Sequence, residues 1–239
     1  MNLLLFDIDG TLTATNRDDD RLFLESVSEV AGQEIEAEGW EAFPHVTDMA
    51  IARELLTRAA GRPAKDREIL AVREIFIRKW VKAVETREVA IEPIPGAREL
   101  LAEARSRRDC VVAIVTGGWS PTAILKLQQA GLDVNGLVIV TSDDDDTRSG
   151  IVSSAIIFAA ANRGTPGFSF VTLIGDGLWD LRAARECGAG FLGLASDAEH
   201  GGRLLAEGAA AVIPNYRDAA KFWSGVDQAI AQQRAAKGR

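Results

Sequence analysis

The stretch LLLFDIDGTL, residues 3–12, joins a short apolar run to a polar turn that carries two aspartates. The run LLLF is too short for a helix, and its large apolar side chains are typical of a buried strand. Asp7 follows this strand directly and Asp9 lies two positions on, so both carboxylates lie on the same side if the backbone stays extended. A single turn of this kind is equally compatible with a solvated loop, so the rest of the chain must decide.

Similar apolar runs recur along the chain, at 110–115, 137–140, 170–174 and 189–194. They are short and rich in β-branched residues, which indicates buried parallel strands. From about residue 93 onward, strands and helical segments alternate, and this pattern predicts right-handed crossovers. We therefore predict an α/β fold with a Rossmann-like, doubly wound parallel sheet that includes strand 3–6.

The helical segments carry recognisable start and stop residues. Ser120 is expected to cap a helix that has Pro121 at its first position and Gly131 after its last turn. Similar stops are expected at Gly164 and Gly188.

Residues 14–92 lack a clear buried strand and instead have helical periodicity. The helical stretches are expected near 18–31, 48–60 and 66–86. The polar stretch TATNR marks the entry to this segment, and the exit is marked by Pro93, Pro95 and Gly96. We predict a core domain of residues 1–13 and 93–239 with an inserted helical cap domain of residues 14–92.

Polar and glycine residues follow the other predicted strands at the point where each strand ends. Thr116, Gly117 and Gly118 follow CVVAIV, and their free backbone N–H groups at the start of a helix suit an anion. Asp176 follows FVTLI, with Asp180 four residues later on the same face of an incipient helix. In open α/β sheets ligands bind at the carboxyl ends of the strands, and clustered carboxylates suit Mg²⁺ there.

The alternative for each of these residues is structural. Thr116 and its glycines would only connect strand to helix, Asp176 would cap the next helix, and Asp180 would be a solvated charge. Because all these groups fall at neighbouring strand ends, we favour a metal site.

Arg148 is the one basic residue between Lys126 and Arg163, in the loop DDDDTRSG ahead of a helix expected near 151–163. A fixed cation there would reduce repulsion within the acidic cluster and hold a phosphate. The alternative is an exposed loop arginine. The neighbouring aspartates, 143–146, are expected to form a solvated acidic loop.

The order DIDGTL, VTGG, a basic residue before a helix, then GDGLWD resembles the haloacid dehalogenase (HAD) superfamily. The resemblance covers essentially the whole chain. The helical insertion after the first motif is similar to the phosphoglycolate phosphatase-like and β-phosphoglucomutase-like branch, in which an α-helical cap closes over the active site. The stretches RECGAGFLGLASD and EGAAAVIPNYRD resemble the closing portion of that branch.

This resemblance implies a role for each matching residue. Asp7 would be the nucleophile and Asp9 the general acid and base, whose backbone carbonyl also binds the metal. Thr116 and Arg148 would bind phosphate, together with Gly117 and Gly118. Asp176 would be a Mg²⁺ ligand, with Asp180 a ligand or its support. Relatives generally carry lysine, often followed by proline, where this chain has Arg148 and Ser149.

The implied activity is that of a Mg²⁺-dependent phosphatase that hydrolyses a small phosphate monoester through an aspartyl-phosphate on Asp7. The dehalogenases of the family attack carbon and need neither a second aspartate nor a metal, so Asp9 argues for phosphoryl chemistry. The alternative is transfer of the phosphoryl group to a sugar phosphate, as in β-phosphoglucomutase.

Two non-enzymatic hypotheses are weaker. A receiver-type signalling module also uses acidic strand ends and Mg²⁺, but it needs only one small domain and has no place for the insertion. A scaffold that retains the fold without turnover is disfavoured because no catalytic position is missing.

A few residues outside the motifs are also of interest as site residues. Thr47 and Asp48 are expected to begin a helix, with His45 just before it, and related caps place a substrate loop about there. We therefore include Thr47 and Asp48 among the candidate substrate-binding residues. His200 is expected to be an exposed loop residue, whereas Trp119 and Trp179 either line the crevice or pack in the core.

Composition limits the partners. With 27 basic and 35 acidic residues the net charge is −8, which argues against a nucleic-acid or anionic-membrane surface. No signal peptide or membrane span is indicated, and Cys110 and Cys187 are expected to be buried, reduced thiols. We expect a cytoplasmic monomer or weak homodimer that acts on a small phosphorylated metabolite.

Overall fold

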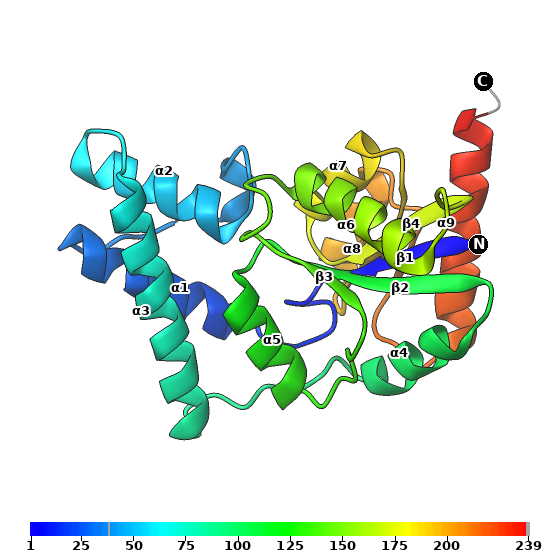
Figure 1. Cartoon of the computed structure of the whole chain (residues 1–239), viewed down its shortest axis with the longest axis horizontal. Coiled ribbons are helices and arrows are strands. Elements are labelled where there is room, and N and C mark those ends of the chain that lie inside the picture. Colours follow the sequence, from blue (N-terminus) through cyan, green and yellow to red (C-terminus); the bar gives the residue numbers. More distant parts are fainter. Residues whose placement is uncertain (38, 238–239) are drawn as a thin grey trace.

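A parallel β-sheet forms the centre of the molecule (Figure 1). The computed structural model describes residues 1–37 and 39–237, and within them six strands form one sheet in the order β3-β2-β1-β4-β5-β6. The strands are β1 Asn2–Phe6, β2 Cys110–Val115, β3 Val138–Val140, β4 Phe170–Gly175, β5 Gly190–Leu194 and β6 Ala211–Ile213. All neighbouring pairs are parallel, so the predicted Rossmann-like α/β fold is confirmed.

Strand β1 is buried on both faces because it lies between β2 and β4. Leu3 and Leu5 pack in a cluster that also contains residues of the helices α6 (Arg148–Arg163) and α7 (Leu178–Glu186). Leu4 and Phe6 point to the opposite face, into a cluster shared with α4 and α9. This alternation explains why the run LLLF is apolar at every position.

Helices flank and extend the sheet, and those predicted near 18–31, 48–60 and 66–86 begin and end within two residues of these bounds. The helices are α1 Asn16–Ala31, α2 Asp48–Ala60, α3 Asp66–Glu85, α4 Ala97–Ser106, α5 Ser120–Gln129, α6 Arg148–Arg163, α7 Leu178–Glu186, α8 Ala198–Ala206 and α9 Ala219–Lys237, with a short 3-10 helix, η1, at Trp40–Ala42. The predicted glycine stops are confirmed, since Gly131, Gly164 and Gly188 all have φ near +66°.

Three details of the sequence prediction are wrong. Strand β6 was not predicted, because its three residues pair only with β5 at the edge of the sheet. Ser120 does not cap α5; Trp119 precedes the helix, and the Ser120 N–H instead donates to Asp143 Oδ2 (3.0 Å). Helix α6 begins at Arg148 rather than near 151, since the Thr147 hydroxyl accepts the Gly150 N–H (3.0 Å) and caps it there.

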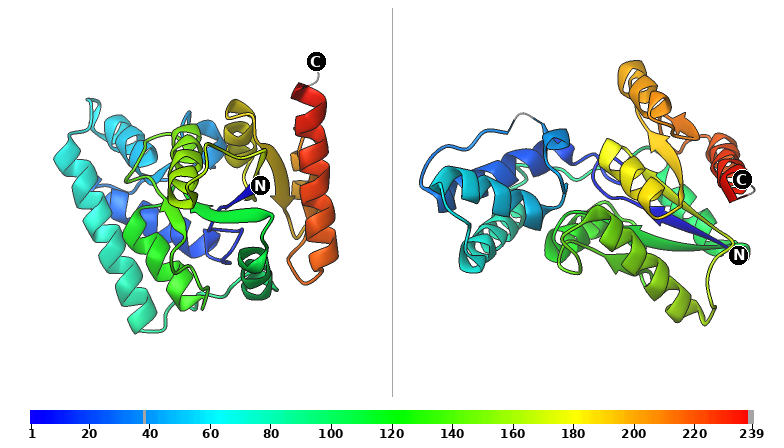
Figure 2. Two further views of the ribbon diagram at one scale, coloured as in Figure 1. Left: turned by 45° about the vertical axis from the view of Figure 1, so that its right-hand side comes forward. Right: turned by 90° about the horizontal axis from the view of Figure 1, so that it is seen from above.

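Helices α1, α2 and α3 lie between β1 and α4 in the chain and gather on one side of the sheet, away from the two termini (Figures 1 and 2). The two connections to the sheet run side by side. The Ala14 N–H donates to Glu92 O and the Ile94 N–H donates to Leu12 O, each at 2.9 Å. This arrangement suits the proposed cap, whose status as a separate domain stays a prediction.

An aromatic cluster joins the inserted helices to the rest of the protein. The ring centroids of Phe23 in α1 and Phe76 in α3 are 5.7 Å apart, and both lie within 5.9 Å of the ring centroid of Trp119, which precedes α5. Trp119 is therefore a packing residue, which was one of its two predicted roles.

Both cysteines are free, as predicted, but only Cys110 is buried. Cys187 is half-buried because it follows the last turn of α7, where its thiol contacts Ser149 O and the Ser153 hydroxyl. None of the helices formed by residues 1–37 and 39–237 combines the length and apolar character needed to cross a bilayer.

The central position of β1 predicts a large cost for shortening its side chains. Leu4 is fully buried, so Leu4→Ala should lower the free energy of unfolding by about 3 kcal/mol, measured by urea denaturation. Leu70→Ala is the matched control, because Leu70 is 53% exposed. Equal losses for the two variants would contradict this description of the core.

Candidate active site

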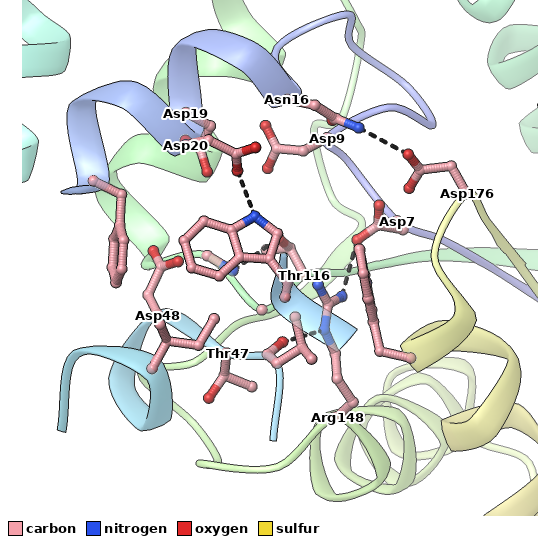
Figure 3. Close-up of a pocket in the computed structure, with 17 residues that line it drawn as sticks. Asp7, Asp9, Asn16, Asp19, Asp20, Thr47, Asp48, Thr116, Arg148 and Asp176 are labelled. Atoms are coloured by element: carbon pink, nitrogen blue, oxygen red, sulfur yellow. Dashed lines mark hydrogen bonds and ion pairs between the residues drawn. The ribbon is translucent and has the colours of Figure 1, made fainter. Parts of the chain in front are cut away.

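A cavity of about 190 Å³ lies at the carboxyl ends of the strands, between the sheet and the inserted helices (Figure 3). All but one of the predicted site residues line it. They are Asp7, Asp9, Thr47, Asp48, Thr116, Gly117, Gly118, Arg148 and Asp176. Asp180 does not line the cavity but is buried behind it, in contact with Arg148.

Asp7 is the most buried of the carboxylates that line the cavity. It follows β1, its N–H donates to Ile174 O of β4 (3.0 Å), and it is only 2% exposed. Burial and the neighbouring charge of Asp180 raise the pKa of Asp7 to about 8, although Arg148 opposes this shift. A carboxylate in such a position needs positive charge nearby to be ionised.

Arg148 supplies part of that charge. Its Nη1 lies 3.1 Å from Asp7 Oδ1 and 3.1 Å from Asp180 Oδ1, and its Nε donates to Val46 O at 2.7 Å. The cap at Thr147 sets the first turn of α6 so that the Arg148 side chain reaches inward. The expectation of a cation in the acidic cluster is met, and the exposed-loop alternative is wrong.

Asp7, Asp176 and Asp180 can together hold a cation, because each offers a carboxylate oxygen within 4.8 Å of the others. Burial raises the pKa of Asp176 to about 7, with the Asp7 charge adding to it, and burial raises the pKa of Asp180 to about 6. Hard oxygen ligands that repel one another in this way fit a divalent ion such as Mg²⁺.

The structural alternatives for Asp176 and Asp180 are also wrong. Asp176 accepts a hydrogen bond from Asn16 Nδ2 (2.8 Å) rather than capping α7. Asp180 is buried, and its Oδ2 accepts the Gly177 N–H (3.3 Å).

Two glycines beside the site residues leave no room for a side chain. Gly10 has φ +73°, and a Cβ there would lie 2.0 Å from Asp176 Oδ2. A Cβ at Gly117 would lie 2.6 Å from Val46 O and 2.8 Å from Arg148 Nε. Both glycines therefore let the polar groups of the site approach the backbone closely.

Lys126 is a site residue that the sequence analysis missed. It is 1% exposed, its Nζ donates to Asp9 Oδ1 (2.7 Å) and to Asp19 Oδ1, and it lies over the Trp80 ring. Thr15 also donates to Asp9 Oδ1 (2.5 Å). One pattern could have revealed Lys126: it shares a helix stripe with the buried Ala123 and Leu127.

The inserted helices supply the other side of the cavity. Thr47 caps α2, as predicted, by accepting the Ala50 N–H (3.2 Å), and it also donates to Asp146 O (2.8 Å). Asp48 accepts the Trp119 N–H (3.0 Å), whereas His45 is exposed and does not line the cavity. The sequence analysis did not predict the remaining lining residues of the insertion, which are Asn16, Asp19, Asp20, Phe23, Trp40, Val46 and Ile51.

Other expectations need correction. His200 is not in an exposed loop: Asp197 caps α8, and the His200 ring Nε2 donates to the Asp176 carbonyl (2.6 Å).

Residues 143–146 are not merely solvated, because they hold the loop before α6. For example, the Asp144 carboxylate accepts the Thr141 N–H (2.9 Å), and the Asp145 carboxylate accepts the Thr147 N–H (2.8 Å). Trp179 lines the cavity, which was one of its two predicted roles.

Comparison with known proteins identifies the family. The family model described as haloacid dehalogenase-like hydrolase matches residues 1–188. This chain belongs to the haloacid dehalogenase-like hydrolases. The predictions of family and enzyme class are therefore confirmed, and the receiver hypothesis is wrong.

Solved structures of this hydrolase family have the same fold. A hydrolase from Pseudomonas syringae is 25% identical, with a TM-score of 0.71 over 94% of this chain and 98% of its own. A candidate β-phosphoglucomutase from Bacteroides vulgatus is 21% identical, with a TM-score of 0.71 over 96% and 90%. A predicted phosphoglycolate phosphatase from Haemophilus somnus is 14% identical, with a TM-score of 0.60 over 92% and 96%. No curated protein matches the chain.

The acidic triad of this HAD-like hydrolase predicts a pH-dependent response to Mg²⁺. Without metal, the folded chain keeps protons on Asp7, Asp176 and Asp180 that the unfolded chain releases from about pH 4, so its stability should fall as pH rises toward 8. Mg²⁺ competes with these protons, so it should raise the melting temperature more at pH 8 than at pH 5. Thermal melting in EDTA and in Mg²⁺ measures this, and equal shifts at both pH values would contradict it.

The buried ion pairs of Lys126 give a second prediction. Lys126→Met should lower the free energy of unfolding by about 3 kcal/mol, because it leaves the half-buried carboxylates of Asp9 and Asp19 without their buried cation. Urea denaturation measures this loss. Adding Asp19→Asn to Lys126→Met should restore part of the lost stability. If the double variant instead loses as much stability as the two single variants together, Lys126 and Asp19 are not directly coupled.

Proposed function

We propose that this hydrolase is a Mg²⁺-dependent phosphatase that acts on small phosphate monoesters through a covalent intermediate on Asp7. The observation that carries the proposal is the buried Asp7 carboxylate, held by Arg148 beside two further carboxylates and facing a cavity that Asp9 also lines. An anionic nucleophile can approach an anionic phosphate only where positive charge offsets their repulsion.

In the first step, the Asp7 carboxylate attacks phosphorus in line with the leaving oxygen, and the bond from phosphorus to that oxygen breaks. The Arg148 guanidinium and the Gly117 backbone N–H would hold the phosphoryl oxygens. The expectation of a free N–H at Gly118 is wrong, because this group donates to the Thr116 hydroxyl (3.0 Å). When bound by Asp7, Asp176 and Asp180, Mg²⁺ supplies positive charge to the same oxygens.

Asp9 would give its proton to the leaving oxygen in this step. Thr15 and Lys126 hold its Oδ1, whereas Oδ2 has no partner among the described residues. One carboxylate oxygen thus orients the group, and the other is free to transfer the proton. In the second step Asp9 takes a proton from water, which attacks phosphorus and releases phosphate and Asp7.

The phosphomutase alternative has weaker support. A sugar phosphate that receives the phosphoryl group would bring a second phosphate into the cavity. Arg148 is the only basic side chain that lines the cavity in the described part of the chain, and it is already engaged with Asp7. Water is therefore the better-supported acceptor, and the cavity volume of about 190 Å³ suits a small ester.

The test of this proposal is hydrolysis of p-nitrophenyl phosphate and small monoesters by the purified protein. Asp7→Asn should reduce turnover by at least about 10³-fold, because it removes the attacking charge and keeps the shape. EDTA should stop the reaction and Mg²⁺ should restore it. Turnover by Asp7→Asn close to that of the parent would exclude the covalent mechanism, and full activity without metal would exclude the role of Mg²⁺.

A further inference from the structure

The cavity has two chemically different ends. Asp7, Asp176 and Arg148 lie at one end, and Asp19, Asp20 and Asp48 lie at the other, with Asp9 between them (Figure 3). If Asp9 protonates the leaving oxygen, the rest of the leaving group extends past Asp9 toward the aspartates of the inserted helices. Those side chains therefore select the substrate.

The carboxylates at the far end are held in place and still have free oxygens. Asp20 Oδ1 accepts the Trp40 Nε1–H (2.7 Å), and Asp48 Oδ2 accepts the Trp119 N–H (3.0 Å). Asp48 is only 9% exposed, and its Oδ1 has no donor among the residues that the structure describes. This oxygen belongs to a residue on the wall of the cavity, so it can accept a hydrogen bond from a ligand.

The remaining walls at this end are aromatic. Phe23 and Trp40 both line the cavity, and their rings meet edge to face with centroids 5.9 Å apart. Lys126 does not line the cavity, and its ammonium is already bound to Asp9 and Asp19. Carboxylates and aromatic rings without a free cation form the kind of site that binds an ammonium group.

We propose that the substrate is a small phosphate monoester whose leaving group carries a protonated amine, bound by Asp20 and Asp48 beside the rings of Phe23 and Trp40. This inference rests on the phosphatase function proposed above. It disfavours phosphoglycolate, because a carboxylate on the leaving group would face the free oxygen of Asp48 and find no cation to bind.

The electrostatics of the inserted helices agree with this assignment. Burial raises the pKa of Asp20 and Asp48 above the ordinary range and raises the pKa of Asp19 to about 7, although the charge of Lys126 opposes the shift in all three. A positive leaving group stabilises the ionised forms, whereas a neutral or negative one does not.

The experiment compares kcat/KM for phosphate esters of matched size at pH 7 with Mg²⁺. The esters are 2-aminoethyl phosphate, 2-hydroxyethyl phosphate and carboxymethyl phosphate, with p-nitrophenyl phosphate as a general phosphatase substrate. We expect the amine to be preferred over the hydroxyl by about tenfold or more, and the carboxylate to be the poorest. Ratios within one enzyme preparation cancel differences in active fraction.

Two variants and a matched control assign the preference to the far end of the cavity. Asp20→Asn and Asp48→Asn should each lower the ratio of amine to hydroxyl kcat/KM several-fold. Asp18→Asn makes the same charge change on α1, but Asp18 pairs with Arg21 and does not line the cavity, so the ratio should not change. If Asp48→Asn does not fold, Asp20→Asn alone decides.

The outcomes separate the two proposals. Hydrolysis of all four esters without a preference for the amine would overturn the substrate inference and leave the phosphatase function standing. A preference for the amine that persists in Asp20→Asn would also overturn it. Failure to hydrolyse any ester, p-nitrophenyl phosphate included, would overturn the phosphatase function and this inference together.

Discussion

A carboxylate held out of water at the end of the central strand is the constraint on which the rest of the site depends. Asp7 is 2% exposed, so its charge must be balanced locally rather than by solvent. Arg148 provides one balancing contact, and the triad with Asp176 and Asp180 is suited to a metal that provides another. Each of these groups comes from a different strand end or helix start, and the parallel sheet brings them to one edge.

Balancing that charge also ties the inserted helices to the sheet. Arg148 Nε donates to Val46 O, and the Asp48 N–H donates to Gly117 O (2.7 Å). Lys126 of α5 binds Asp19 of α1 in the same way. Opening the cavity would therefore require these polar contacts to be exchanged for water. It would also separate the rings of Phe23 and Phe76 from Trp119.

In the proposed function, the two ends of the cavity have different roles. Asp7, Asp176 and Arg148 form the phosphoryl end, and Asp19, Asp20 and Asp48 form the leaving-group end. The phosphoryl end is built from residues that follow the strands, where hydrogen bonds of the sheet limit backbone movement. The leaving-group end is built from α1, α2 and the segment around Trp40, which can vary without disturbing the sheet. In that proposal, the reaction type and the choice of substrate depend on separate parts of the chain.

The sequence by itself determined the fold class and the phosphoryl end of the site, because both depend on local patterns. Apolar runs such as LLLF locate the buried strands, and Asp7, Thr116 and Asp176 directly follow them, so their convergence needs only parallel pairing. Ser120 and the start of α6 were misplaced because capping depends on single side-chain geometries.

Only the tertiary structure decided the leaving-group end and the contacts of Lys126. The helix stripe shared with Ala123 and Leu127 could indicate that Lys126 is buried, but it could not identify partners that lie 117 residues (Asp9) and 107 residues (Asp19) away in the chain. Asp48 was already a candidate from the sequence, but Asp20 looks like an ordinary helix charge until α1 is packed over the sheet. Helix packing sets these distances through side-chain shape, which no local pattern in the sequence records.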